Sequence, residues 1–338
     1  MPSDRVKFSF SAAKLDLENQ PSTVSKRNGR QRAGANVSES DGGKGQETAP
    51  KKKGDLLPRV ITSVIMVPIL LAMIIVGPHW LWAAFIAAAT AVGLSEFYGM
   101  LQKDEPKSVQ WGSTAIGTAF AASLYLFVGP KPMLGNGSHD PLVIFAVLAV
   151  VLWASFLFNL GRDRDIGRVA VTMSSGLAGV LYVGLTFSFI ALLKRDMGDW
   201  GAGWIIMLLA MTWMSDTGAY FAGRAFGKHK LAPKVSPKKT VEGALGGLLA
   251  TIVAAFVVRA LMLPFLSLID VAVIALVANV LGQTGDLCES LLKRSTGVKD
   301  SGTIIHGHGG MLDRVDAVLF AVPWVYLYAS MCGGAALL

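Results

Sequence analysis

Long apolar segments are the feature of this sequence that most restricts its fold. A helix that crosses a bilayer needs about 20 mainly apolar residues, because the hydrocarbon core is ~30 Å thick. Nine such segments follow one another, near residues 60–77, 80–101, 111–128, 142–160, 170–193, 204–222, 241–262, 264–282 and 315–336. The pattern predicts an all-α polytopic membrane protein with nine transmembrane helices.

Composition and the placement of charge agree with this class. Apolar residues make up 52% of the chain and charged residues 16%, against about 45–50% and about 25% in soluble domains. The formal net charge of +8 would suit a nucleic-acid binder, but such a protein clusters Lys and Arg on a soluble fold. Here they lie at predicted helix ends and in loops. Nucleic acid is therefore not expected as a partner, and Cys288 and Cys332 lack the spacing of a metal site or disulfide framework.

The first 57 residues differ from the rest of the chain. They are rich in Ser, Gly, Asn, Lys and Glu, and a run of lysines, 51–53, lies near their end. Such a segment buries too little apolar surface to offset the entropy of ordering, so we expect a disordered cytoplasmic tail over 1–57 and a transmembrane domain over 58–338. The lysine run either contacts anionic headgroups or acts as a solvated topogenic charge.

Basic residues gather in alternate loops, and this predicts an orientation. Lys and Arg favour the cytoplasmic side of a membrane. With nine helices, the N-terminal lysines and the loops after the second, fourth, sixth and eighth segments fall on one side, and these loops hold most of the basic residues after position 100. Lys194 and Arg195 are the exception. We expect a cytoplasmic N-terminus and an external C-terminus.

An acidic residue in an apolar segment marks the first candidate site. Asp216 lies within or at the end of segment 204–222, where an ionised carboxylate is costly, so it indicates either a functional site or a structural pair with Arg224. Three nearby glycines permit close approach of either a second helix or a phosphate. These are Gly218, Gly223 and Gly227. The polar residues that follow are Lys228, Ser236, Lys238 and Lys239.

A denser polar block covers residues 285–316. Asp286 is expected to end the eighth helix, and Asp313 and Asp316 share one face at the start of the ninth. Mg²⁺ prefers carboxylate oxygens and is typically bound by one or two carboxylates together with substrate phosphates. A solvated juxtamembrane loop would not need three aspartates at the membrane edge.

The same block carries the charge that phosphates need. Its basic residues are Lys293, Arg294, Lys299 and Arg314. The turn His308-Gly309-Gly310 leads into a helix N-terminus, which favours anions. Carboxylates for a metal, cations for phosphate and glycines for backbone approach together indicate phosphoryl or nucleotidyl transfer, which is a reaction class and not yet a substrate.

A long signature runs through this block. Its positions are Ser290, Lys293, Arg294, Lys299, Asp300, Gly302, Ile305, His308, Gly309, Gly310, Asp313, Arg314 and Asp316. This pattern resembles the signature of phosphatidate cytidylyltransferases (CDP-diacylglycerol synthases), and the block around Asp216 is similar to the same family. The resemblance covers residues 57–338. It departs from the family at His306, where Pro or Gly is usual; histidine leaves the backbone freer than proline would and adds a titratable group near the phosphates.

Members of the family convert phosphatidic acid and CTP into CDP-diacylglycerol and pyrophosphate with Mg²⁺. The resemblance implies that Asp286 and Asp313 are the best metal ligands and that Asp316 is the next; whether a second cation joins Mg²⁺ stays open. It implies direct attack of the lipid phosphate on the α-phosphorus, with no covalent enzyme intermediate. The catalytic residues it implies are Lys293, Arg294, Lys299, Asp300, His308 and Arg314. The substrate-binding residues are Asp216, Arg224, Lys228, Ser236, Lys238, Lys239, Ser290, Gly309 and Gly310.

The resemblance further implies a bacterial inner (plasma) membrane protein that forms a homodimer, with its active site on the cytoplasmic face. Which wall of the site holds CTP and which holds the lipid stays open. Two other functions would suit parts of this pattern. A CTP-dependent polyprenol or dolichol kinase would release CDP instead of pyrophosphate, and the full signature argues against it. A transporter could use the intramembrane aspartates as an ion path, but it would not need so many phosphate-matched cations.

Overall fold

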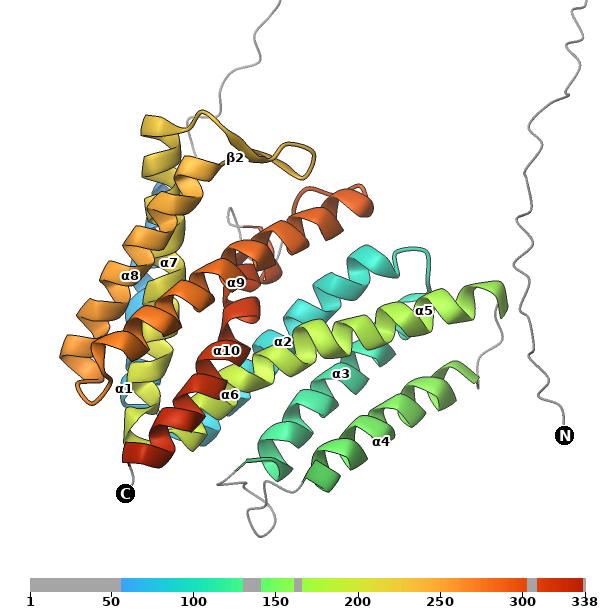
Figure 1. The fold of residues 1–338 in the computed structure, drawn as a ribbon. Coiled ribbons are helices and arrows are strands. Elements are labelled where there is room, and N and C mark those ends of the chain that lie inside the picture. Colours follow the sequence, from blue (N-terminus) through green and yellow to red (C-terminus); the bar gives the residue numbers. More distant parts are fainter. Residues whose placement is uncertain (1–55, 130–140, 161–165, 303–308, 337–338) are drawn as a thin grey trace, which may run out of the picture. The chain divides into compact units, whose positions relative to one another are not determined.

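The structure is a computed structural model that describes residues 56–129, 141–160, 166–302 and 309–336 (Figure 1). The predicted tail lies almost wholly outside this part. The long helices are α1 (Leu56–Ile75), α2 (His79–Leu101), α3 (Lys107–Phe127), α4 (Pro141–Leu160), α5 (Ile166–Gly179), α6 (Thr186–Asp196), α7 (Gly201–Phe226), α8 (Val241–Met262), α9 (Leu268–Ser295) and α10 (Leu312–Ala336). A π-helical turn, Val180–Leu185, joins α5 to α6, and a 3₁₀ turn, Gly198–Trp200, precedes α7.

The membrane class predicted from the sequence is confirmed. Each of the nine predicted segments coincides with a helix, if α5 and α6 are taken as the continuous helix Ile166–Asp196. Within the described residues, seven helices are long and apolar enough to cross a membrane; they begin at His79, Val143, Ile166, Gly198, Val241, Leu268 and Leu312. The expected nine crossings therefore stay a prediction for α1 and α3. The orientation also stays a prediction.

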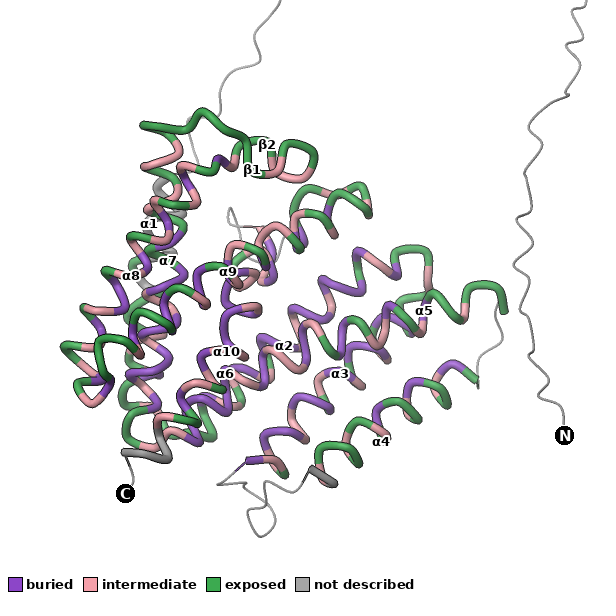
Figure 2. Tube along the Cα trace, viewed as in Figure 1, coloured by how far each residue is buried: buried purple, intermediate pink, exposed green. Residues whose placement is uncertain are grey.

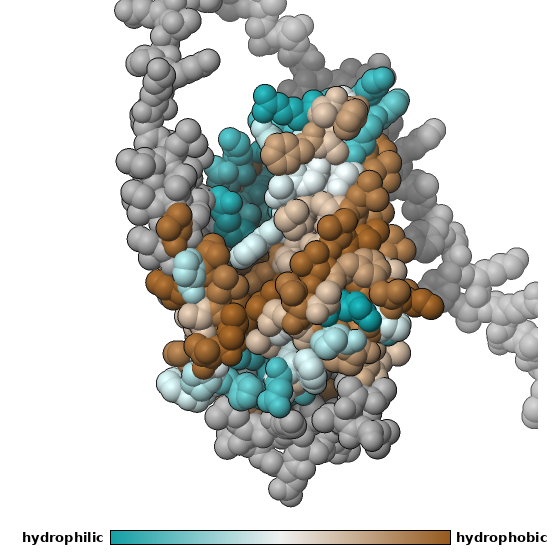
Figure 3. Space-filling view, turned by 90° about the vertical axis from the view of Figure 1, so that its left-hand side faces the viewer, coloured by the Kyte–Doolittle hydropathy of each residue, from teal (hydrophilic) through white to brown (hydrophobic). Residues whose placement is uncertain are grey.

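Burial is distributed as a bilayer allows. The side chains of α2, α6 and α10 form the centre of the described part, while α4 exposes most of its apolar side chains (Figure 2). A band of hydrophobic side chains crosses the face drawn in Figure 3, with hydrophilic side chains gathered toward its upper and lower ends. Lipid tails are as apolar as leucine, so exposed apolar side chains carry no penalty there.

Helix α9 differs most from its predicted extent. The sequence predicts a helix over 264–282, whereas the helix begins after Ser267, whose side chain and that of Asp270 form a reciprocal capping box. It then continues to Ser295, so Asp286 lies inside the helix and does not end it. The first part of the 285–316 block is therefore helical, and its side chains project at helical spacing.

A short hairpin between α7 and α8 was not expected in an all-α chain. Strand β1 (Lys230–Ala232) pairs antiparallel with β2 (Ser236–Thr240). Glu242 accepts hydrogen bonds from the backbone N–H groups of Lys228 and His229 and contacts His229 Nδ1 at 2.6 Å. These contacts tie the hairpin to the start of α8.

The three glycines of the first polar block pack against α8 and its cap. A Cβ at Gly218 would lie 2.6 Å from the carbonyl oxygen of Gly246, and one at Gly223 would lie 3.0 Å from Thr240 Oγ1. A Cβ at Gly227 would also meet Thr240. The sequence left open whether these glycines approach a second helix or a phosphate; in the structure they contact a second helix.

The basic pair that departed from the predicted charge pattern is buried. Lys194 Nζ donates to the carbonyls of Met73 and Gly77, at 2.7 and 2.8 Å, just where α1 ends. Arg195 donates to the carbonyls of Tyr125 and Val128 at the end of α3 and pairs with Asp196. Terminal helix carbonyls lack intrahelical donors, and these two cations supply them. We call Lys194, Arg195 and Asp196 the α6-end cluster.

Candidate active site

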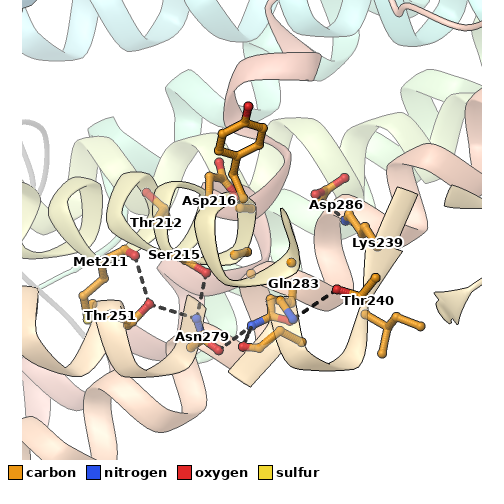
Figure 4. A pocket seen from close by; sticks show the side chains of 18 of the residues that line it. Met211, Thr212, Ser215, Asp216, Lys239, Thr240, Thr251, Asn279, Gln283 and Asp286 are labelled. Atoms are coloured by element: carbon orange, nitrogen blue, oxygen red, sulfur yellow. Dashed lines mark hydrogen bonds and ion pairs between the residues drawn. The ribbon is translucent and has the colours of Figure 1, made fainter. Parts of the chain in front are cut away.

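A cavity of about 500 Å³ opens between α7, the hairpin, α8 and α9 (Figure 4). Its lining runs from Met211 and Thr251, deep in the membrane-spanning helices, to Arg224 and Lys238 at the hairpin end. Ala317 places α10 at its edge. The cavity is mostly apolar with a few polar groups converging on it, which is the usual make-up of a small-molecule site.

An ion pair joins the two polar blocks at the mouth of this cavity. Lys239 of β2 pairs with Asp286 of α9, and Ser290 lies one turn further along with its Oγ 3.5 Å from Asp286 Oδ1. Asp216 interacts electrostatically with Asp286 and Lys239. Arg224 donates to Tyr220 Oη at 3.1 Å, and no ion pair joins it to Asp216 within the described residues. The purely structural Asp216–Arg224 pair is therefore absent there, and Asp216 faces the cavity.

Lys293 of α9 holds the start of α10 through Asp313 and also pairs with Glu289 on its own helix. Its Nζ lies 2.9 Å from Glu289 Oε2 and 2.6 Å from Asp313 Oδ1. Asp313 Oδ2 also accepts the backbone N–H groups of Ser301 and Gly310, each at 2.9 Å. A carboxylate offers about four lone-pair sites, so Asp313 keeps room for one further contact.

Glu96 of α2 is a buried carboxylate of this region that the sequence reading missed. It accepts from the backbone N–H groups of Met311 and Leu312, at 2.9 and 3.0 Å, and from the Ser301 hydroxyl at 3.3 Å. A Cβ at Gly310 would lie 2.6 Å from its Oε2. An acidic residue inside the apolar segment 80–101 was the available signal.

Negative charge exceeds positive charge here. We call Asp216, Lys239, Asp286, Glu289, Lys293, Asp313 and Asp316 the cavity cluster; it contains five carboxylates and two lysines. Asp216, Lys239 and Asp286 line the cavity, together with the basic residues Arg224 and Lys238. Glu289 Oε1 is buried without a hydrogen-bond partner in the described part of the chain, and the neighbouring carboxylate is that of Asp316. The buried hydroxyl of Tyr182, on the π-helical turn, faces the same carboxylates and likewise has no partner there. No local pattern in the sequence singles out Glu289 or Tyr182.

This arrangement fits a divalent cation. No group of three His, Cys, Asp or Glu side chains converges closely enough to hold a metal within the described residues. Mg²⁺ does not require one, because it is usually held by one or two carboxylates and completed by substrate phosphates. Surplus carboxylates and an orphaned buried oxygen are what such a cation would balance.

The other predicted residues are more scattered. Arg294, Lys299, Asp300 and Arg314 are exposed, and Arg294 donates to the Val298 carbonyl at 3.4 Å. Lys228 is exposed and Ser236 is half-buried, and neither lines the cavity. Gly309 has φ +81°, which favours glycine. His306 and His308 lie outside the described residues.

A helical membrane protein with a charged, carboxylate-rich cavity defines a class, and comparison with known proteins identifies the family. Residues 57–332 match the cytidylyltransferase family, and the chain belongs to it. It is 32% identical to the phosphatidate cytidylyltransferase of Bacillus subtilis, over 82% of this chain and 98% of that protein. The proteins of the same name from Thermotoga maritima and Brucella suis are 30% and 33% identical, over 83% and 82% of this chain and 98% and 94% of theirs. The resemblance noted in the sequence is confirmed.

Proposed function

We propose that this enzyme transfers the cytidylyl group of CTP to phosphatidic acid, giving CDP-diacylglycerol and pyrophosphate. The observation that carries the proposal is the Lys239–Asp286 pair, because it brings the two predicted polar blocks together at the mouth of one cavity. The family and the names of its relatives supply the substrates.

The basic residues of the mouth would bind the phosphates. Arg224, Lys238 and Lys239 line the cavity next to Asp286, so they can neutralise the lipid phosphate and the triphosphate as these approach each other. Two like-charged reactants repel, and fixed cations offset that repulsion without reorganising during the reaction. The lipid phosphate is itself the nucleophile, so no side chain needs to form a covalent intermediate.

The carboxylates would hold the cation. Asp286 and Asp313 remain the proposed ligands and Asp316 the next, with Glu289 adding negative charge beside them. Bound there with the substrate phosphates, Mg²⁺ supplies charge neutralisation at the reacting phosphorus and the leaving pyrophosphate. Lys293 keeps Asp313 in place and Glu96 keeps the start of α10 in place, so both act by positioning.

The position of the cavity among apolar helices suits a lipid substrate. The cavity runs down into membrane-spanning helices, so the lipid tails can stay among them while the headgroup meets CTP at the mouth. A cytoplasmic location of the mouth and a homodimer remain predictions.

The reaction can be tested directly. The purified protein is incubated with phosphatidic acid, Mg²⁺ and CTP labelled in the α-phosphate. We expect label in the lipid fraction and one pyrophosphate released per labelled lipid. Release of CDP with no label in the lipid would instead show a CTP-dependent kinase.

A further inference from the structure

Four polar side chains form the floor of the cavity, well below its charged mouth. We call Ser215, Thr251, Asn279 and Gln283 the polar floor (Figure 4). Asn279 Nδ2 donates to Ser215 Oγ and to Thr251 Oγ1, both at 2.8 Å. Gln283 Nε2 donates to Asn279 Oδ1 at 2.7 Å, and Thr251 Oγ1 donates to the Met211 carbonyl at 3.1 Å. The network thus links α7, α8 and α9.

The floor lies on helices that are long and apolar enough to cross a membrane. Asn279 precedes Asp286 by seven residues on α9, which is a distance of ~10 Å along the helix. Around it the lining is apolar, with Met211, Ala219 and Ala278 among the residues. Polar side chains at this depth are costly unless they are satisfied or serve a site.

The network leaves two groups to spare. Both amide hydrogens and the amide oxygen of Asn279 are used, as is the hydroxyl hydrogen of Thr251. Ser215 accepts from Asn279, so its own hydrogen is directed elsewhere, and no acceptor for it lies within the described residues. Gln283 donates from Nε2 alone, and its Oε1 is the acceptor of the polar floor that has no hydrogen bond within the described residues. A ligand that reaches the floor therefore meets one free hydroxyl donor in apolar surroundings.

We propose that the polar floor is a subsite for the glycerol ester carbonyls of the diacyl lipid substrate, with the Ser215 hydroxyl donating to one of them. This inference rests on the proposed function. An ester carbonyl is a neutral acceptor, so it can take a hydrogen bond from a hydroxyl group without a counter-charge. Asp216 follows Ser215 on α7 and also lines the cavity, so its carboxylate disfavours a phosphate beside Ser215.

The cytosine base of CTP is the other group that could occupy the polar floor. The residues that line the floor do not favour a base. A base bound in a protein usually stacks on an aromatic ring. Tyr220 is the aromatic residue of the described lining, and it lies five residues beyond Ser215 on α7, hydrogen-bonded to Arg224 at the mouth. Stacking is therefore available near the triphosphate and not at the floor.

The test compares two lipids in the purified full-length enzyme. One is diacyl phosphatidic acid and the other is the dialkyl ether analogue of the same chain length, which lacks the carbonyls. One net hydrogen bond is worth about 0.5–1.5 kcal/mol, so we expect kcat/KM to be about 3- to 10-fold higher for the diester. Ser215→Ala should remove this preference by lowering kcat/KM for the diester alone, with the KM for CTP unchanged.

Thr217→Ala is the matched control, because it removes another α7 hydroxyl, one that bonds its own helix at the Trp213 carbonyl. It should keep the wild-type preference. Equal use of the two lipids by the wild type would overturn the subsite without needing any variant to fold. A change in selectivity for CTP over UTP in Ser215→Ala, with the lipid preference intact, would assign the floor to the base instead. Absence of any labelled lipid from the wild type would contradict the proposed function itself.

Discussion

The α6-end cluster and the cavity cluster both place lysine or arginine beside carboxylates at helices long and apolar enough to cross a membrane. In the α6-end cluster each charged side chain has hydrogen-bond partners from the protein. Lys194 and Arg195 bind four backbone carbonyls, and Asp196 pairs with Arg195 and accepts from Tyr326 Oη at 2.7 Å. The cavity cluster has five carboxylates and two lysines, with Arg224 and Lys238 in the same cavity lining, and Glu289 Oε1 has no hydrogen-bond partner within the described residues.

This difference separates a structural charge from a functional one. Charge in a membrane helix is expensive in both places. Where every polar atom is satisfied by the protein, removal of one group costs folding energy. Where the balance is incomplete beside a cavity, the missing charge is expected from a ligand, and removal of one group should cost activity instead.

Replacement of Arg195 should have the largest effect, and it should be on stability. Arg195→Ala leaves Asp196 buried without its cation and uncaps α3, so we expect a loss of about 3–5 kcal/mol in the free energy of unfolding. Denaturation in detergent measures this. Arg195→Lys keeps the charge but not the planar fork, and should lie between alanine and wild type. Unchanged stability in Arg195→Ala would contradict the structural role of the α6-end cluster.

Replacement of Asp286 should act on turnover. Asp286→Asn removes a proposed cation ligand at the mouth, and we expect kcat/KM to fall about 100- to 1,000-fold, the scale of losing one electrostatic stabiliser. The midpoint of unfolding should stay near that of the wild type, because Asp286 is partly exposed and pairs with one lysine. Asp270→Asn, in the capping box at the other end of α9, is the control and should leave turnover unchanged. Near-normal turnover in Asp286→Asn would remove Asp286 from the site.

Glu96→Gln should give the smallest of the three effects and should touch both properties. Glutamine keeps one acceptor oxygen but loses the charge that binds the N–H groups of Met311 and Leu312. We expect a loss of about 1–3 kcal/mol in stability and a parallel fall in turnover as the start of α10 shifts. Thermal unfolding and label transfer, measured on one preparation, test this. A fall in turnover with stability unaltered would instead place Glu96 among the groups that contact substrate.

Much of the fold was legible because bilayer thickness imposes one length on every crossing helix. Local signals also placed the two polar blocks, since Asp216 and Asp286 stand out against apolar neighbours. The hairpin was missed because its strands have three and five residues and no apolar alternation. The length of α9 was underestimated because the polar residues after position 282 were expected to end the helix. A helix can continue beyond the membrane edge, and α9 continues as far as Ser295.

Long-range partners were the part that no local pattern could supply. Glu96 lies more than 200 residues from the backbone groups that it binds. Lys194 and Arg195 read as loop charge, and only their packing against the ends of α1 and α3 shows them to be caps. Asn279 is one polar residue in an apolar segment until α7 and α8 bring Ser215 and Thr251 to it.

Helix α9 sets the spacing between the parts of the site. This one continuous helix bears Asn279 of the polar floor, Asp286 at the cavity mouth and Lys293, which binds Asp313 of α10. Insertion of a single residue between Asn279 and Asp286 would rotate the two by about 100° relative to each other, so floor and mouth could no longer face one cavity. The spacing of side chains along this helix therefore fixes the distance at which a headgroup and its neighbouring atoms can be recognised together.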